Sequence, residues 1–167
     1  SRLDRDCYIA DLISDILSSG RSSRFYQRLI KEQQLFSYID AYISGTTDPG
    51  LFIVDGRLME GVTMEQAGAA IWKELRQMAT ELLPPRELEK IKNKAESNLV
   101  FSESSALNKS MSLAYFEYLE NIELINSEVQ IYQTITAEEV LRVSAEMFDE
   151  NAHVELFYLP SAENNRD

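Results

Sequence analysis

The apolar residues near the start of the chain recur at steps of three and four positions, which is the spacing of one buried helix face. The residues that carry this pattern are Tyr8, Ile9, Leu12, Ile13, Ile16 and Leu17. They predict a helix over residues 5–19, followed by Gly20 at the position where helices often end in a left-handed residue. Ser22 and Ser23 then offer an N-cap for a second helix that runs to about residue 33.

The pattern changes after residue 34, where β-branched and aromatic residues replace the helical spacing. Two strands are predicted, over residues 35–46 and 51–59. They are separated by Thr47-Asp48-Pro49-Gly50, a sequence typical of a tight turn. Because so short a connection joins neighbouring strands, we expect an antiparallel hairpin.

The second half of the chain is mainly helical by the same criteria. Thr63 with Gln66, and Thr136 with Glu139, have the spacing of a capping box. They predict helices that begin at these threonines and end near residues 83 and 148. Pro84-Pro85 stops the first of these helices and opens another. Further helices are expected over residues 85–101, 107–118 and 125–132, and a strand over residues 154–158.

This order of elements predicts an α+β domain in which an antiparallel β-sheet packs against several α-helices. Three strands are few for so many amphipathic helices, so we expect a missing N-terminal strand, upstream of Ser1, that would complete a four-stranded sheet. A chain of 167 residues fits a single domain. We assign residues 1–160 to that domain and residues 161–167 to a polar tail.

Charge and hydropathy exclude several classes of partner. The chain carries 16 Lys and Arg residues against 28 Asp and Glu residues, a formal net charge of −12, which repels phosphate backbones and anionic lipids. No segment approaches the roughly 18 consecutive apolar residues that a membrane helix needs. We therefore expect a soluble cytoplasmic or periplasmic domain, with no nucleic acid partner, no membrane insertion, and any signal peptide upstream of this chain.

Scarce residue types limit the chemistry. The chain has one cysteine, Cys7, and one histidine, His153, whereas a zinc site takes three or four ligands. We therefore expect no metal site in this chain and a structural role for His153. The many helix carboxylates fit a solvated acidic face, because a di-metal site needs two Glu-x-x-His motifs. The serines lack a G-x-S-x-G elbow, which argues against a serine hydrolase.

The segment Gly20-Arg21-Ser22-Ser23-Arg24 has two interpretations. Backbone N–H groups at a helix start and two guanidinium groups could bind a small anion there. The segment lacks the spacing of the known phosphate loops, so a structural corner is favoured. An unrelated helix-rich domain that binds an anion at this corner stays open as an alternative.

Four segments follow one another in a familiar order. They are Gly20-Arg-Ser-Ser-Arg-Phe-Tyr-Gln-Arg-Leu29, Lys31-Glu-Gln-Gln-Leu-Phe-Ser-Tyr38, Asp48-Pro-Gly-Leu-Phe-Ile53 and Glu87-Leu-Glu-Lys-Ile-Lys-Asn-Lys94. In this order the chain resembles the insulinase/pitrilysin-type zinc peptidases, the inverzincins that include the mitochondrial processing peptidase. The match is to the C-terminal, non-metal domain of one half of such an enzyme. That domain's pattern reads G-x-S-S-R-L, R-E-x-x-G-L-A-Y-S, G-x-F and E-L-x-x-x-K.

The resemblance implies a metallohydrolase-like, ferredoxin-like α/β roll and a function without catalysis of its own. In this family an H-x-x-E-H motif and a distant glutamate hold zinc in the preceding domain. This chain lacks that motif, so the resemblance implies an inactive part of a zinc metalloendopeptidase. Its role would be to bind the peptide substrate and complete the chamber beside a preceding catalytic domain or paired subunit that holds the zinc. The alternative is a structural or assembly domain of the same fold, as in core subunits of respiratory complexes.

The resemblance also nominates individual residues. Ser22, Ser23 and Arg24 match S-S-R, and the family's tyrosine of L-A-Y-S aligns with Ser37, one position before Tyr38. A shift of one position moves a side chain to the opposite face of a strand. The candidate substrate-binding residues are Arg24, Ser37 and Tyr38, and the structural corner comprises Gly20, Ser22 and Ser23. A missing strand would also leave an exposed sheet edge, through which we expect self-association.

Overall fold

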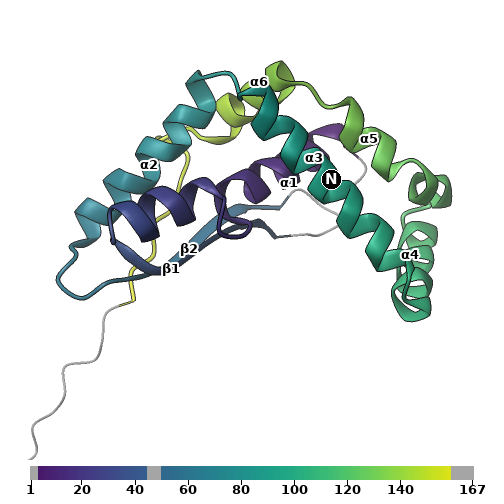
Figure 1. Cartoon of the computed structure of the whole chain (residues 1–167), viewed down its shortest axis with the longest axis horizontal. Helices are drawn as coiled ribbons and strands as arrows, with labels where there is room; N and C mark the ends of the chain where they lie inside the picture. The colour runs from purple at the N-terminus through teal and green to yellow at the C-terminus, as the bar shows by residue number, and fades with distance from the viewer. Residues whose placement is uncertain (1–3, 45–49, 159–167) are drawn as a thin grey trace, which may run out of the picture.

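The computed structural model describes residues 4–44 and 50–158. Within them a two-stranded antiparallel sheet lies against a layer of helices, which confirms the predicted α+β class. Figure 1 shows α1 (Arg5–Ser18) over the hairpin and α4 (Ala106–Tyr118) at one end of the molecule. The other elements are η1 (Phe25–Glu32), β1 (Phe36–Ile43), β2 (Phe52–Leu58), α2 (Met64–Thr80), α3 (Pro85–Glu103), η2 (Ile122–Asn126), α5 (Glu128–Thr134) and α6 (Ala137–Met147).

The hairpin has one buried and one exposed face. Strand β1 pairs with β2 from Phe36 opposite Leu58 to Ile43 opposite Phe52, with an irregularity between Phe36 and Tyr38. On the inner face Ile39 and Ala41 are buried against α1. The opposite face carries polar and aromatic side chains to solvent. The predicted hairpin is therefore confirmed; its turn, apart from Gly50, lies outside the described residues.

Both predicted capping boxes are present. The Thr63 hydroxyl accepts a hydrogen bond from the Gln66 backbone N–H, and the Gln66 side chain accepts one from the Thr63 backbone N–H. Thr136 and Glu139 make the same reciprocal pair at the start of α6. These local signals fix where α2 and α6 begin.

Two helical predictions differ in detail. Residues 25–32 form a π-helix, in which backbone N–H groups bond five residues back, as Gln33 does to Arg28. The predicted helix 125–132 divides into the 3₁₀-helix η2 and the short helix α5. The Ser127 hydroxyl bonds back to the Leu124 carbonyl at that junction, an arrangement that competes with continuous helix.

The predicted strand 154–158 is wrong. These residues form no strand, and Val154 and Tyr158 are almost fully exposed. Alternating apolar and polar residues form a strand only where a neighbouring strand supplies backbone hydrogen bonds. The described sheet consists of β1 and β2, and residues 154–158 pair with neither strand. The segment is instead anchored beside α2, where the His153 ring packs edge-to-face on Trp72 with centroids 4.9 Å apart.

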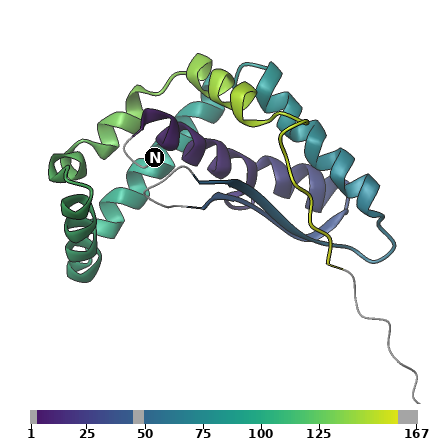
Figure 2. The ribbon, with the colours of Figure 1, turned by 180° about the vertical axis from the view of Figure 1, so that it is seen from behind.

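The core gathers around α1, which Figure 2 shows between the hairpin and the other helices. Its apolar stripe is buried as predicted and meets side chains from η1, α3 and α6. Fully buried members of this core include Ile9, Leu12, Ile13, Leu17, Phe25, Leu29, Ile135 and Val140. This core holds the corner at Gly20 and the hairpin in fixed positions relative to the helices.

Candidate functional site

The corner after α1 is built around a left-handed glycine and a buried serine. Gly20 has φ of +81°, which suits the position predicted for it at the helix end. The Ser23 backbone N–H donates to the Gly20 carbonyl at 3.1 Å, and its hydroxyl accepts from the Tyr26 N–H at 3.4 Å. Ser23 is buried, so this hydroxyl caps the start of η1 from inside the fold.

Arg24 lies at the end of this corner and binds α3. Its Nε and one terminal nitrogen donate to the two carboxylate oxygens of Glu87 at 3.1 and 2.9 Å. Both side chains are largely buried. Nearby, Lys90 Nζ donates to the carbonyl and hydroxyl of Ser22, each at 3.3 Å. The G-x-S-S-R and E-L segments are thus in direct contact, and any anion at the corner would compete with Glu87 for Arg24.

A buried carboxylate lies on the same side of the fold. Glu74 of α2 is only 1% exposed and accepts a hydrogen bond from Arg28 of η1, which also donates to the Gln77 side chain. Neither residue of this pair was among the predicted site residues. The sequence does contain a signal that Glu74 is buried. Glu74 lies four residues after Ala70 and four before Met78, on the apolar stripe of α2.

The outer face of the hairpin holds the other candidate residues. Tyr38, Asp40 and Tyr42 alternate along β1 and lie opposite Arg57, Asp55 and Ile53 of β2. The Tyr38 hydroxyl donates to Asp40 at 3.4 Å, and the Ser37 hydroxyl donates to the Arg57 carbonyl at 3.1 Å. Loss of solvent around its ring, followed by the Asp40 and Asp55 charges, raises the pKa of Tyr38. Ser37 is also exposed, because the strand irregularity beside it interrupts the alternation of faces.

The candidate residues therefore form two groups. Arg24 binds a helix on the inner side of the hairpin, whereas Ser37 and Tyr38 bond within the hairpin itself. Tyr38 and Tyr42 are about half exposed, at 50% and 43%, and flank Asp40 on an open face. Of the two groups, the one on this face is the more accessible to solvent.

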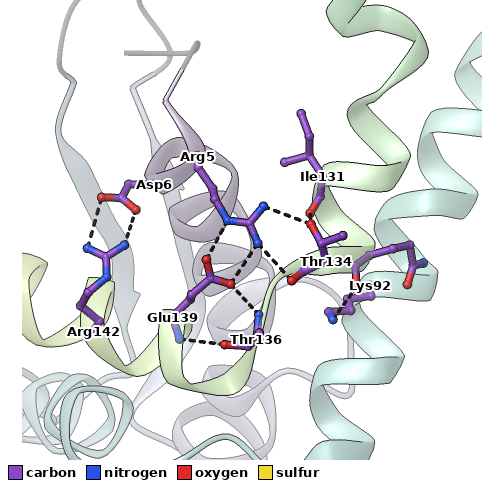
Figure 3. A network of polar contacts seen from close by, with 9 residues as sticks. Arg5, Asp6, Lys92, Ile131, Thr134, Thr136, Glu139 and Arg142 are labelled. Carbon is purple, nitrogen blue, oxygen red and sulfur yellow. Dashed lines mark hydrogen bonds and ion pairs between the residues drawn. The ribbon is translucent and has the colours of Figure 1, made fainter.

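A second polar network joins the start of α1 to the junction of α5 and α6 (Figure 3). Arg5 donates to both carboxylate oxygens of Glu139, at 2.7 and 3.0 Å, and to the hydroxyl and carbonyl of Thr134. The hydrogen bond from Arg5 is the main reason that the pKa of Glu139 falls to about 2. Arg142 pairs with Asp6 beside it. The network connects elements that are distant in sequence and has the features of a structural clamp.

Metal binding has no support in the described part of the chain. Residues 4–44 and 50–158 contain no group of three or more His, Cys, Asp or Glu side chains placed to hold a metal ion. His153 lies against the Glu150 carbonyl, with Nδ1 at 2.8 Å from the oxygen, and against Glu155 at 3.4 Å. Within the same ranges no helix is long and apolar enough to cross a membrane.

Comparison with known protein families identifies the family of this chain. The model of the peptidase M16 inactive domain matches residues 1–95, and the chain belongs to this family. Its membership confirms the resemblance drawn from the sequence motifs. The chain is therefore an M16 domain that is not catalytic by itself. Among curated proteins none matches this chain.

Solved structures share the fold at low sequence identity. The inactive peptidase domain of a candidate zinc protease from Bordetella parapertussis has a TM-score of 0.87 and 18% identity, with 98% of this chain and 89% of that one covered. A protease from Helicobacter pylori has a TM-score of 0.83 and 18% identity over 88% of this chain. The peptidase M16 inactive domain from Pseudomonas fluorescens has a TM-score of 0.74 and 16% identity over 89%. The chain spans only 36% of the Helicobacter protein and 35% of the Pseudomonas protein.

Proposed function

We propose that this chain is the substrate-binding companion of a zinc-bearing peptidase domain, and that it binds an extended peptide as an added strand at the edge of the β1–β2 hairpin, beside the outer face of the hairpin. The observation that carries the proposal is the open face on which Tyr38 and Tyr42 flank Asp40, with Asp55 directly opposite. The zinc in this proposal belongs to the companion domain, since the described residues of this chain contain no group of three or more His, Cys, Asp or Glu side chains placed to hold a metal ion.

Backbone geometry supports peptide binding at the hairpin. In the described sheet β1 and β2 each pair on one side only. On β1 the Ala41 N–H already donates to the Asp40 carboxylate and the Ala41 carbonyl accepts from the Ser18 hydroxyl, so β2 presents the more open edge of backbone N–H and C=O groups. An extended peptide can add to such an edge, with affinity from main-chain hydrogen bonds and selectivity from neighbouring side chains. The same edge accounts for the self-association that we expect when no companion domain is present.

Charge supports a preference among peptides. Asp40 and Asp55 face each other on the outer surface, which also carries Arg57 two positions along β2 from Asp55. The two carboxylates repel each other, and one guanidinium group leaves this face with a net negative charge. A lysine or arginine side chain of a bound peptide would relieve that repulsion. Tyr38 and Tyr42 would pack against the aliphatic part of the same side chain. We therefore propose that basic residues are preferred next to the strand-adding segment.

Steady-state kinetics of the assembled peptidase test this function, with the zinc-bearing domain on the same polypeptide or on a partner subunit. We expect Asp40→Asn to lower kcat/KM about tenfold for a peptide with one arginine and little for its norleucine analogue. Glu89→Gln, which removes an exposed carboxylate on α3, is the control. If Asp40→Asn and Tyr38→Ala leave both peptides unaffected, while the peptidase still requires this chain to assemble, the domain is a scaffold and the proposal is wrong.

A further inference from the structure

Helix α4 presents an apolar stripe to solvent. Its members recur at steps of four, four and three residues, which is the spacing of a single helix face. They are Leu107, Met111, Tyr115 and Tyr118, with 69%, 62%, 38% and 71% of their surface exposed. Val100 and Phe101, near the end of the preceding helix α3, are also exposed. We call these six residues the α4 face.

Packing within the described chain does not account for the α4 face. Helix α4 contacts α3 and η2 with its other side, where Phe116 is its one buried side chain. Figures 1 and 2 both show α4 at the end of the molecule, away from the hairpin. An amphipathic helix normally turns its apolar stripe toward a core and its polar residues toward water. In α4 the stripe faces outward although another side already packs inward.

The charged residues of α4 lie away from its apolar stripe, just as charged residues are depleted at the centre of protein interfaces. Lys109 and Glu117 are the only charged residues of this helix, and at 100° per residue both lie off the stripe. Lys109 Nζ lies 3.9 Å from a carboxylate oxygen of Glu103. Asn108 and Ser110, which flank the stripe, are uncharged. A face without charge in a chain of net charge −12 fits a lasting contact, because interface cores are depleted in charged residues.

The size of the face fits an interface between domains. Aromatic side chains bury about 150–250 Å² each, and the six exposed residues together offer roughly 700 Å² of side-chain surface. Contacts between domains of one protein bury about 600–1,500 Å², and an exposed apolar surface of this order fits such a contact.

We infer that the α4 face is the docking surface for the zinc-bearing domain of the same peptidase; this inference rests on the proposed function and names where the partner binds. Glu117 and Glu120, both exposed, lie at or just after the C-terminal end of α4 beside the face. The occupant is therefore a surface with an apolar centre and a basic rim. A second copy of this chain would bring the same acidic rim and another −12 of charge, which disfavours it. The Helicobacter and Pseudomonas chains are nearly three times as long as the part that this chain covers, which leaves room for such a domain.

Methionine oxidation tests the docking without any mutation. Met111 of the α4 face and Met59 after the hairpin are 62% and 44% exposed. In the 167-residue chain alone we expect hydrogen peroxide to convert both to the sulfoxide at similar rates. In the assembled peptidase we expect Met111 to react at least tenfold more slowly relative to Met59. An unchanged Met111 to Met59 ratio would overturn the docking at α4.

Two matched double variants test how much the α4 face contributes to the association with the zinc-bearing domain. Leu107→Lys with Met111→Lys should weaken the association between this chain and the zinc-bearing domain at least a hundredfold. The control is Leu51→Lys with Leu82→Lys, which adds the same charge at two exposed leucines outside the α4 face. This control should change the association less than threefold. Near-equal melting temperatures of the two isolated double variants would confirm that both fold.

The outcomes separate this inference from the proposed function. If the wild-type chain does not associate with the zinc-bearing domain, the proposed function and the docking both fail. If it associates and the α4 variant associates equally well, only the docking at α4 fails. If sedimentation shows a dimer of the chain that Leu107→Lys with Met111→Lys abolishes, the face binds a second copy and the inference is wrong.

Discussion

The guanidinium group of Arg24 and the carboxylate of Glu87 form two parallel hydrogen bonds across 63 residues of sequence. This bidentate geometry is the strongest arrangement for a side-chain ion pair, and partial burial limits its screening by solvent. The pair connects the corner after α1 to the first turn of α3. Two segments that carry the family resemblance thus support each other physically.

We expect Arg24→Ala to lower the melting temperature, because it removes this pair and leaves Glu87 partly buried without its cation. A loss of about 1–2 kcal/mol corresponds to about 3–6 °C for a domain near this size. Thermal unfolding followed by circular dichroism measures it. Arg21→Ala, at an exposed position in the same corner, is the control and should shift the melting temperature by less than about 1 °C.

The same variant separates the two roles of Arg24. If Arg24→Ala lowered kcat/KM of the assembled peptidase while its melting temperature stayed unchanged, Arg24 would contact substrate and its structural role would be wrong. A double-mutant cycle with Glu87→Gln adds a second criterion. Coupling near zero would show that the ion pair does not contribute to stability.

The buried Glu74 makes Arg28 a residue whose loss should be costly. Arg28→Met leaves the Glu74 carboxylate buried without its cation, and unpaired buried charges cost about 3–5 kcal/mol. Arg28 is itself partly exposed, so we expect the lower end of this range. Adding Glu74→Met should recover much of the lost stability. Urea unfolding measures both variants, and a double variant less stable than Arg28→Met alone would contradict this account.

Local features of the fold could be predicted from the sequence, whereas pairings between distant residues could not. The capping boxes at Thr63 and Thr136 depend on residues three positions apart, so their pattern is visible in the chain itself. The Arg24–Glu87 and Arg28–Glu74 pairs join different elements, and nothing in the sequence around one partner identifies the other. The strand predicted at 154–158 failed for the same reason, because its formation depends on a neighbouring strand and not on its own alternation.

The candidate site was predicted in part. Tyr38 was nominated by its position relative to a family motif, but the open face that it shares with Tyr42 and Asp55 depends on the register of the hairpin. The helix over residues 107–118 is predicted by its periodicity, but periodicity gives the spacing of apolar residues and not the direction in which they point. The exposure of Leu107, Met111 and Tyr118, together with the burial of Phe116 on the opposite side, shows that the stripe points outward.

Stability at low pH should reflect the Arg5–Glu139 clamp. The pKa of Glu139 is lowered from 4.5 to about 2 in the folded protein. A lowered carboxyl pKa adds stability above the unfolded value, and this contribution is lost as the pH falls from about 4.5 to about 2. Glu139→Gln should therefore cost about 1–2 kcal/mol at pH 7, from the cap and the partly exposed ion pair, and progressively less below pH 4.5.

Unfolding titrations of wild type and Glu139→Gln between pH 7 and pH 2 measure this difference. Glu146→Gln is the control, since Glu146 also pairs with an arginine but is well exposed and caps no helix. Its effect should stay below about 0.5 kcal/mol throughout. A pH-independent cost of Glu139→Gln would contradict the clamp as an electrostatic device.

Two glycines should respond to alanine with opposite signs. A Cβ atom at Gly50 would overlap the carbonyl oxygen of Ser44, where the Ser44 N–H donates to the Leu51 carbonyl at 2.9 Å and closes the hairpin. Backbone cannot move aside as a flexible side chain does, so Gly50→Ala should destabilise the protein by about 1–3 kcal/mol.

At Gly68, within α2, a Cβ would meet only the Glu155 carboxylate, at 4.0 Å. Gly68→Ala should therefore stabilise the protein by about 0.5–1 kcal/mol, through the lower entropy of the unfolded chain. Chemical denaturation of both variants provides the test, and a stabilising Gly50→Ala would show that the hairpin end has a different backbone path.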